Sequence, residues 1–254
     1  MRTEILYEDK SIMVVRKPAG LAVQSAGIGQ PDVVSELKSY LAKLPGAGRT
    51  GKGEPYLGIV HRLDQPVEGL LVFAKDTKAA AALSKQLTEG ALNKHYYAVL
   101  CGYPDCPEGD LVDYLRKEGN VAVAVTGREQ EFADAKIAAL HYRILEEINA
   151  PSPLALADVT IGTGRFHQIR VQFAHAGFPL FGDTKYGTAV LKEAMPAQKY
   201  RGVALCAYSL ELVHPVSGKK MGFRVVPKNP AFAGFAMEEL KKLTENETGI
   251  SKRG

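Results

Sequence analysis

The sequence predicts an α+β protein with a mixed, largely antiparallel sheet and flanking helices. Strand-like runs outnumber helical ones, and two strand-like runs repeatedly follow each other without a helix between them. A doubly wound parallel sheet would instead need a crossover helix after nearly every strand. With 46% hydrophobic and 24% charged residues among 254, the composition excludes collagen-like, coiled-coil and low-complexity chains.

Nine runs rich in valine, isoleucine, leucine and aromatic residues predict strands. They cover residues 4–7, 11–16, 69–74, 96–101, 121–125, 135–145, 154–161, 203–212 and 223–226. Helical periodicity covers residues 32–44, 77–92, 168–175 and 230–243. Asp32 precedes the first of these helices and Gly177 follows the third, which suits helix ends.

Two polar or glycine- and proline-rich stretches, residues 45–55 and 187–202, predict loops rather than domain linkers. We therefore expect one domain over residues 1–244, followed by a polar tail over residues 245–254. Neither a spanning apolar stretch nor a secretory leader is apparent, which favours a cytoplasmic protein.

The charge distribution and the cysteine content indicate which partners and metal sites the protein can have. The formal net charge is +4, and residues 161–224 hold nine Lys and Arg against three acids, so this segment is net positive. Such a distribution favours a polyanionic partner but also suits a solvated face. The three cysteines form no C-x-x-C pair and have no histidine at zinc-finger spacing, so we expect idle thiols and no metal site.

Residues 46–53 (GAGRTGKG) nearly match a phosphate-binding loop. Gly53 replaces the Ser or Thr that binds magnesium, and Pro55 interrupts the helix that should follow. A basic loop is therefore favoured over a nucleotide triphosphate site.

Two other segments combine ionisable and apolar residues. In residues 58–64 (GIVHRLD), Asp64 follows an apolar run. Such an aspartate is usually a turn residue, but a nearby guanidinium can keep it ionised in a dry pocket, as a nucleophile requires. In residues 163–187, Arg165 and Arg170 flank His167 and Gln168 at a predicted helix start, a pattern that can bind an anion or can serve as an amphipathic surface.

Together these segments resemble the RluA-type pseudouridine synthases. The resemblance rests on five blocks in the family's order: residues 5–20, 58–76, 94–102, 164–187 and 204–218. It implies the pseudouridine synthase catalytic fold with a basic cleft, and an enzyme that converts uridine to pseudouridine within RNA without a cofactor or metal. It also implies a catalytic domain over residues 1–244, with no N-terminal accessory RNA-binding domain.

The resemblance also implies roles for single residues. Asp64 matches the family nucleophile, which attacks either the sugar or the uracil ring. Arg165 matches the arginine that pairs with it, and Tyr96 matches the tyrosine that stacks on the base and is proposed to move a proton. Arg62 resembles the residue that holds the target nucleotide out of its helix. We further expect contacts with RNA from His61, His167, Gln168, Arg170 and Lys185.

The chain departs from the family at Val67, Glu68, Gln172 and Cys206, which bears on the substrate more than on the reaction. We expect the partner to be ribosomal or transfer RNA, and we expect no association with a membrane. We also expect the protein to act as a monomer. Two other functions stay open: an RNA-binding protein that has lost catalysis, and an Asp-nucleophile glycosidase. The glycosidase needs another carboxylate about 5 Å from that of Asp64. Glu68 is the candidate that lies near Asp64 in the sequence.

Overall fold

A computed structural model describes residues 1–25, 27, 29–44, 54–127, 133–149, 152–187 and 202–237. The described chain divides into two compact units. Unit 1 comprises residues 1–94, 207–227 and 237, and unit 2 comprises residues 95–206 and 228–236. The catalytic domain expected over residues 1–244 stays a prediction, and the expected tail lies outside the described residues.

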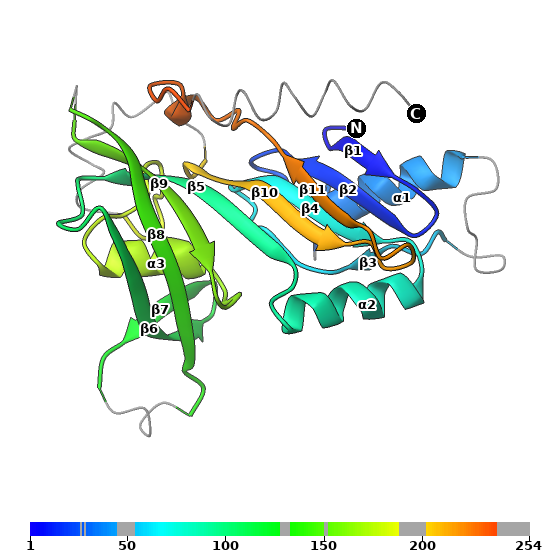
Figure 1. Cartoon of the computed structure of the whole chain (residues 1–254), viewed down its shortest axis with the longest axis horizontal. Coiled ribbons are helices and arrows are strands. Elements are labelled where there is room, and N and C mark those ends of the chain that lie inside the picture. Colours follow the sequence, from blue (N-terminus) through cyan, green and yellow to red (C-terminus); the bar gives the residue numbers. More distant parts are fainter. Residues whose placement is uncertain are drawn as a thin grey trace. The chain divides into compact units, whose positions relative to one another are not determined.

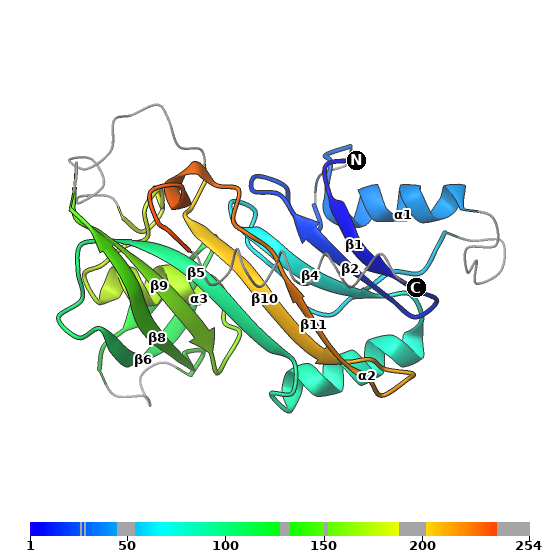
Figure 2. The same ribbon diagram turned by 45° about the horizontal axis from the view of Figure 1, so that its top comes forward.

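Unit 1 is built mainly from strands. These are β1 (Glu4–Glu8), β2 (Ile12–Lys17), β3 (Gly58–Ile59), β4 (Glu68–Ala74), most of β10 (Leu205–Val213) and β11 (Lys220–Arg224). Their order is β1-β2-β4-β10, with β3 on β4 and β11 on β10 (Figure 1). Every residue of β2 and β4 is buried, and Figure 2 shows β4 between β2 and β10. Continuous apolar runs produce such strands because both of their faces are covered.

The two helices of unit 1 begin where the sequence predicts. Helix α1 (Val33–Lys43) is capped by Asp32, whose carboxylate accepts from the Ser35 N–H, and α2 (Thr77–Thr88) is capped in the same way by Asp76. These caps satisfy N–H groups that have no partner within the helix. Helix α2 ends before the predicted residue 92, since Gly90 adopts a left-handed conformation with φ +71°.

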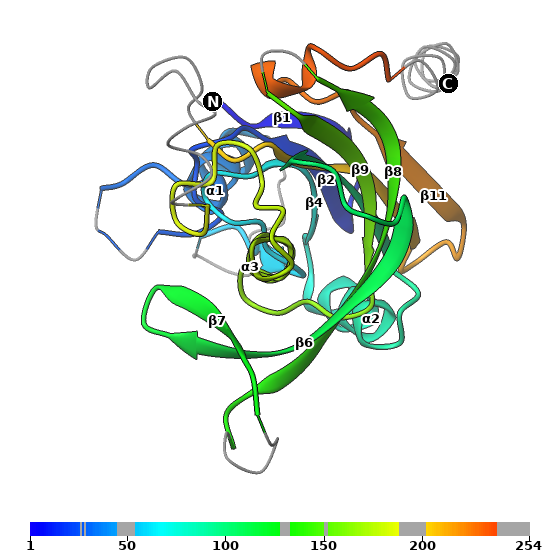
Figure 3. The ribbon, with the colours of Figure 1, turned by 90° about the vertical axis from the view of Figure 1, so that its left-hand side faces the viewer.

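Unit 2 is an antiparallel sheet with one helix. Its elements are most of β5 (Asn93–Cys101), β6 (Glu108–Glu118), β7 (Val121–Val125), β8 (Lys136–Ile148), β9 (Leu154–Ile161) and α3 (Gln168–His175). The strand order is β5-β9-β8-β6-β7. Figure 3 shows α3 within the curve of this sheet. Val171 of α3 packs there against Leu115, Ala122 and Ala138.

Two predictions about elements need correction. Strand β6 was not predicted, since its acidic and basic residues hide the alternation that leaves Leu115 buried. The helix predicted over residues 230–243 is wrong in its described part: only Pro230–Phe232 form a 3-10 helix, capped by Asn229, and residues 238–243 lie outside the described residues. Phe232 and Phe235 are both buried. A spacing of three between buried residues occurs in turns as well as in helices, so it did not identify a helix here.

Three other sequence predictions concern loops, cysteines and the membrane. Most of the predicted loops 45–55 and 187–202 lie outside the described residues. The three cysteines are free thiols, as expected, and burial raises the pKa of Cys101 to about 11. Among the described residues, no helix has the length and apolar character needed to cross a membrane.

Candidate active site

Asp64 lies on the short connection between β3 and β4 and is half-buried. Its carbonyl accepts from the Val67 N–H at 3.1 Å, which closes a tight turn immediately before β4. The next residue, Gln65, exchanges two bonds with Gly20: the Gly20 N–H donates to the Gln65 carbonyl at 2.8 Å, and the Gln65 amide donates back at 3.3 Å. Residues 64–67, the Asp64 loop, are therefore tied to the segment that follows β2.

A buried lysine anchors this loop. Lys17, the last residue of β2, is 0% exposed, and its ammonium donates to the carbonyls of Pro18, Leu21 and Gln65 at 3.0, 2.7 and 3.1 Å. Burial lowers the pKa of Lys17 to about 7, while the charges of Asp64 and Glu68 favour the ammonium form. The Lys17 side chain thus joins the Asp64 loop to the segment that follows β2, and its positive charge attracts the Asp64 carboxylate.

Glu68 is engaged in a buried ion pair at the start of β4. Its carboxylate meets Arg16 at 3.3 Å, and Arg16 also donates to the Val226 carbonyl at 2.7 Å. The negative charge of Glu68, which departs from the family pattern, is therefore compensated by Arg16. Gly69 follows it with φ +128°, and a Cβ there would lie 2.4 Å from the Ala207 carbonyl oxygen, so only glycine fits between β4 and β10.

His61 and Arg62 lie just before Asp64 in very different surroundings. His61 is buried, and its Nε2 accepts from the Val72 N–H at 3.3 Å. Burial, with a smaller effect of Lys94, lowers the pKa of His61 to about 3, so its ring is neutral. These contacts favour a structural role for His61 over the predicted contact with RNA, whereas Arg62 is exposed.

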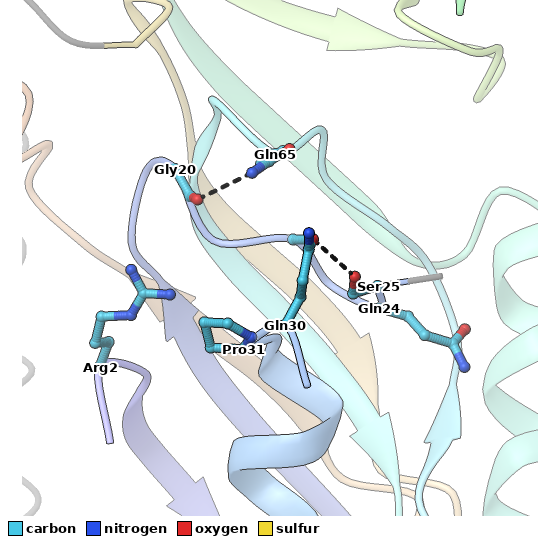
Figure 4. A pocket seen from close by; sticks show the side chains of 8 residues that line it. Arg2, Gly20, Gln24, Ser25, Gln30, Pro31 and Gln65 are labelled. Carbon is cyan, nitrogen blue, oxygen red and sulfur yellow. Dashed lines mark hydrogen bonds between the residues drawn. The ribbon is translucent and has the colours of Figure 1, made fainter. Parts of the chain in front are cut away.

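A polar pocket of about 420 Å³ lies beside the Asp64 loop within unit 1. Its lining includes Arg2, Gly20, Gln24, Ser25, Gln30 and Gln65. Figure 4 shows the Gln65 amide meeting Gly20, and the Ser25 hydroxyl meeting Gln30. The pocket therefore offers amide, hydroxyl and guanidinium groups next to the residue that follows Asp64.

In unit 2, Arg165 lies on the loop that joins β9 to α3. Gln168 shapes this loop: its side-chain oxygen accepts from the Thr163 hydroxyl at 2.7 Å and from the Arg165 N–H at 3.0 Å, and its amide donates to the Ala139 carbonyl at 3.0 Å. The Arg165 Nε donates to the Ile137 carbonyl at 2.9 Å. Since Gln168 is buried among these partners, it positions Arg165, and its predicted contact with RNA has no support from this geometry.

Arg170 is also buried, in a bidentate ion pair. Its Nε and one terminal nitrogen meet the two carboxylate oxygens of Asp183 at 2.7 and 2.8 Å. Its guanidinium also lies 5.1 Å from the centre of the Tyr186 ring. Because the guanidinium is already engaged by a carboxylate, this geometry favours a structural role for Arg170, and its contact with RNA stays a prediction.

The other predicted residues of unit 2 differ in exposure. Lys185 is exposed, and its ammonium donates to the Asn120 carbonyl at 2.6 Å. His167 is half-buried, with its Nδ1 2.5 Å from the Tyr186 hydroxyl. Tyr96 lies on β5, buried, opposite Val159 of β9.

The predicted site residues thus fall into two groups. Unit 1 brings together His61, Arg62 and Asp64, and the remaining six belong to unit 2. The pairing of Arg165 with Asp64 joins residues of different units and stays a prediction. Sequence reasoning missed the supporting residues Lys17 and Asp183, although Arg16 and Lys17 at the end of an apolar run were a usable signal.

The expected basic cleft also stays a prediction. Of the positive residues in 161–224, Lys192, Lys199 and Arg201 lie outside the described residues. Arg170 is ion-paired with Asp183, and Arg224 lies 3.6 Å from Glu211. Local charge counted along the sequence therefore overstates the charge that these residues offer to a partner.

Comparisons with known proteins agree with the motifs. Residues 11–175 match the family described as RNA pseudouridylate synthase. Ribosomal large subunit pseudouridine synthase D of Zymomonas mobilis is 35% identical over 87% of this chain, and the enzyme of that name from Pseudomonas aeruginosa is 35% identical over 86%. The chain spans 68% and 66% of these relatives, about two thirds of their length. The structure of human RNA pseudouridylate synthase domain containing 1 is similar in fold, with a TM-score of 0.71 at 18% identity over 95% of this chain and 94% of that one.

Proposed function

Because the chain belongs to the RNA pseudouridylate synthase family, in its RluA-type branch, we propose that it isomerises uridine to pseudouridine in ribosomal RNA. Asp64 is the nucleophile, and the reaction needs no cofactor. The observation that carries this proposal is the Asp64 loop, which is closed by the Val67 N–H and tied to buried Lys17 through the Gln65 carbonyl. A half-buried carboxylate on a loop fixed in this way is suited to attack.

The reaction balances without any external oxidant or reductant. A carboxylate oxygen of Asp64 forms a bond either to C1′ of the sugar or to C6 of the uracil, and in both routes the C1′–N1 bond breaks and leaves its electron pair on the uracil. The uracil turns, C5 bonds to C1′, and the bond to Asp64 breaks, which returns the carboxylate. The hydrogen on C5 leaves as a proton, and N1 takes up a proton, so substrate and product have the same composition.

The other predicted residues have distinct tasks in this proposal. Arg165 pairs with the Asp64 carboxylate, and Tyr96 stacks on the uracil and helps to move the proton. A base within a helix cannot reach these groups, so the target uridine must leave its stack, and exposed Arg62 helps to hold it out of the helix. The unstacking costs a few kcal/mol, which contacts with phosphates and aromatic rings offset.

The glycosidase alternative loses its second carboxylate. Glu68 is buried against Arg16 at 3.3 Å, so it is already engaged and is not presented as an acid to a sugar. A retaining glycosidase needs that acid. The other alternative, an RNA-binding protein that has lost catalysis, is tested by the experiment below.

The test is release of tritium from RNA labelled at C5 of uridine, since this hydrogen leaves only when C5 forms the new bond. Ribosomal RNA and transfer RNA are prepared separately from a strain that lacks this gene. We expect the chain to release tritium from ribosomal RNA. Release from transfer RNA alone would show that transfer RNA, not ribosomal RNA, is the substrate. Binding without release from either RNA would favour an RNA-binding protein that has lost catalysis.

A further inference from the structure

Phe166 is an exposed aromatic residue that its neighbours hold in place. The residue follows Arg165 directly and is 40% exposed. It stacks on the His167 ring, with 3.7 Å between centroids and 23° between planes.

The support below Phe166 is made of several contacts. His167 adopts a left-handed conformation with φ +54°, which is uncommon for a residue other than glycine. Its ring meets Tyr186 edge-on at 5.6 Å, and its Nδ1 lies 2.5 Å from the Tyr186 hydroxyl. That hydroxyl also accepts from the Ala122 N–H of β7 at 2.8 Å. Backbone strain that surrounding contacts maintain is frequent at functional sites.

The charges around Phe166 favour an anionic partner. The Lys117 ammonium lies 5.0 Å from the centre of the Phe166 ring, and Lys185 is held at the neighbouring Asn120 carbonyl. Two acids that the structure describes in this region are paired, Glu118 with Arg116 and Asp183 with Arg170. Aromatic rings flanked by lysines are the usual means of binding single-stranded nucleic acid without reading its sequence.

From this arrangement we propose that Phe166, His167, Tyr186 and Lys117, here called the Phe166 platform, stack an unpaired RNA base next to the target uridine. Its position beside Arg165 as part of the active site rests on the proposed function, whereas the stacking itself does not. His167 covers one face of the ring, so the incoming base takes the other face. The displaced Lys117 ammonium then binds a phosphate of the same strand.

The chain contains no tryptophan, which allows a direct optical test. Phe166→Trp places a single tryptophan on the platform, and Leu145→Trp places one at a control site of equal exposure in unit 2, since Leu145 is 41% exposed. The probe is a single-stranded RNA decamer of alternating cytidine and adenosine, which contains no uridine and cannot be turned over. We expect the RNA to quench the tryptophan at position 166 and to leave the one at position 145 unchanged.

Affinity measurements complete the test. Phe166→Ala should weaken binding of the decamer about 5- to 100-fold at fixed salt, with an unchanged circular dichroism spectrum, while Leu145→Ala should bind like the wild type. Equal quenching at both positions, or wild-type affinity in Phe166→Ala, would overturn the platform. Quenching without tritium release would overturn the proposed function alone, and tritium release without quenching would overturn the platform alone.

Discussion

The loop that carries Asp64 in unit 1 and the loop that carries Arg165 in unit 2 are held by different chemistry. The Asp64 loop depends on the buried ammonium of Lys17, which donates to three carbonyls. The Arg165 loop depends on the amide of Gln168 and the hydroxyl of Thr163. A lysine titrates and an amide does not, so we expect the two loops to respond differently to pH.

The buried Arg170–Asp183 pair of unit 2 carries the largest expected effect on stability. Arg170→Met leaves the Asp183 carboxylate buried without its counter-charge, which should lower the free energy of unfolding by about 3–5 kcal/mol. Urea denaturation measures the change. The double variant Arg170→Met/Asp183→Asn should recover part of the loss. Wild-type stability with weakened RNA binding in Arg170→Met would instead restore the role predicted from sequence.

A second variant, Lys17→Met, tests the ionic support of the Asp64 loop. The folded pKa of about 7 lies below the ordinary value of 10.5, so between these pH values the unfolded chain holds a proton that the folded chain has lost. Stability of the wild type therefore rises with pH across this range. Lys17→Met lacks this gain, so its deficit should grow from pH 7 to pH 9 by up to about 1.4 kcal/mol per pH unit. Parallel stability profiles would show that Lys17 does not titrate there.

A third variant, Gln168→Glu, should give the neutral loop a pH dependence of opposite sign. The new carboxylate keeps the bonds from Thr163 and Arg165 but cannot donate to the Ala139 carbonyl, at a cost of about 1–3 kcal/mol. Burial beside that carbonyl raises the pKa of the new carboxyl, so the protonated form can donate and stability is lost as pH rises through this pKa. Urea denaturation at pH 5 and pH 8 measures the difference, and an equal loss at both would contradict it.

Sequence reasoning predicted the strands and helix starts well where local chemistry determines them. The apolar runs became β2 and β4, buried throughout, and Asp32 became a helix cap. It failed at β6, where a strand exposed on one face carries as many charges as a loop. It also failed beyond Phe232, because a buried aromatic pair fits a turn as well as a helix.

The residue types of the site were predictable, but their tasks were less so. His61, Gln168 and Arg170 read as ligands of RNA because their side chains are polar, yet all three are buried among protein partners. Burial depends on which distant segment packs over a residue, for example Ala139 over Gln168, and a single sequence does not contain that information. Phe166 was missed for the converse reason, since its exposure is a property of the fold.

The central claim is that Asp64 is the nucleophile, and tritium release by two matched variants tests it most directly. Asp64→Asn replaces the attacking carboxylate, whereas Asp76→Asn changes a half-buried aspartate of the same unit that caps α2, where asparagine is an equally good cap. We predict that Asp64→Asn loses at least about 10³-fold in rate while it still binds RNA, and that Asp76→Asn releases tritium like the wild type. Release by Asp64→Asn at a rate near that of Asp76→Asn would contradict the account.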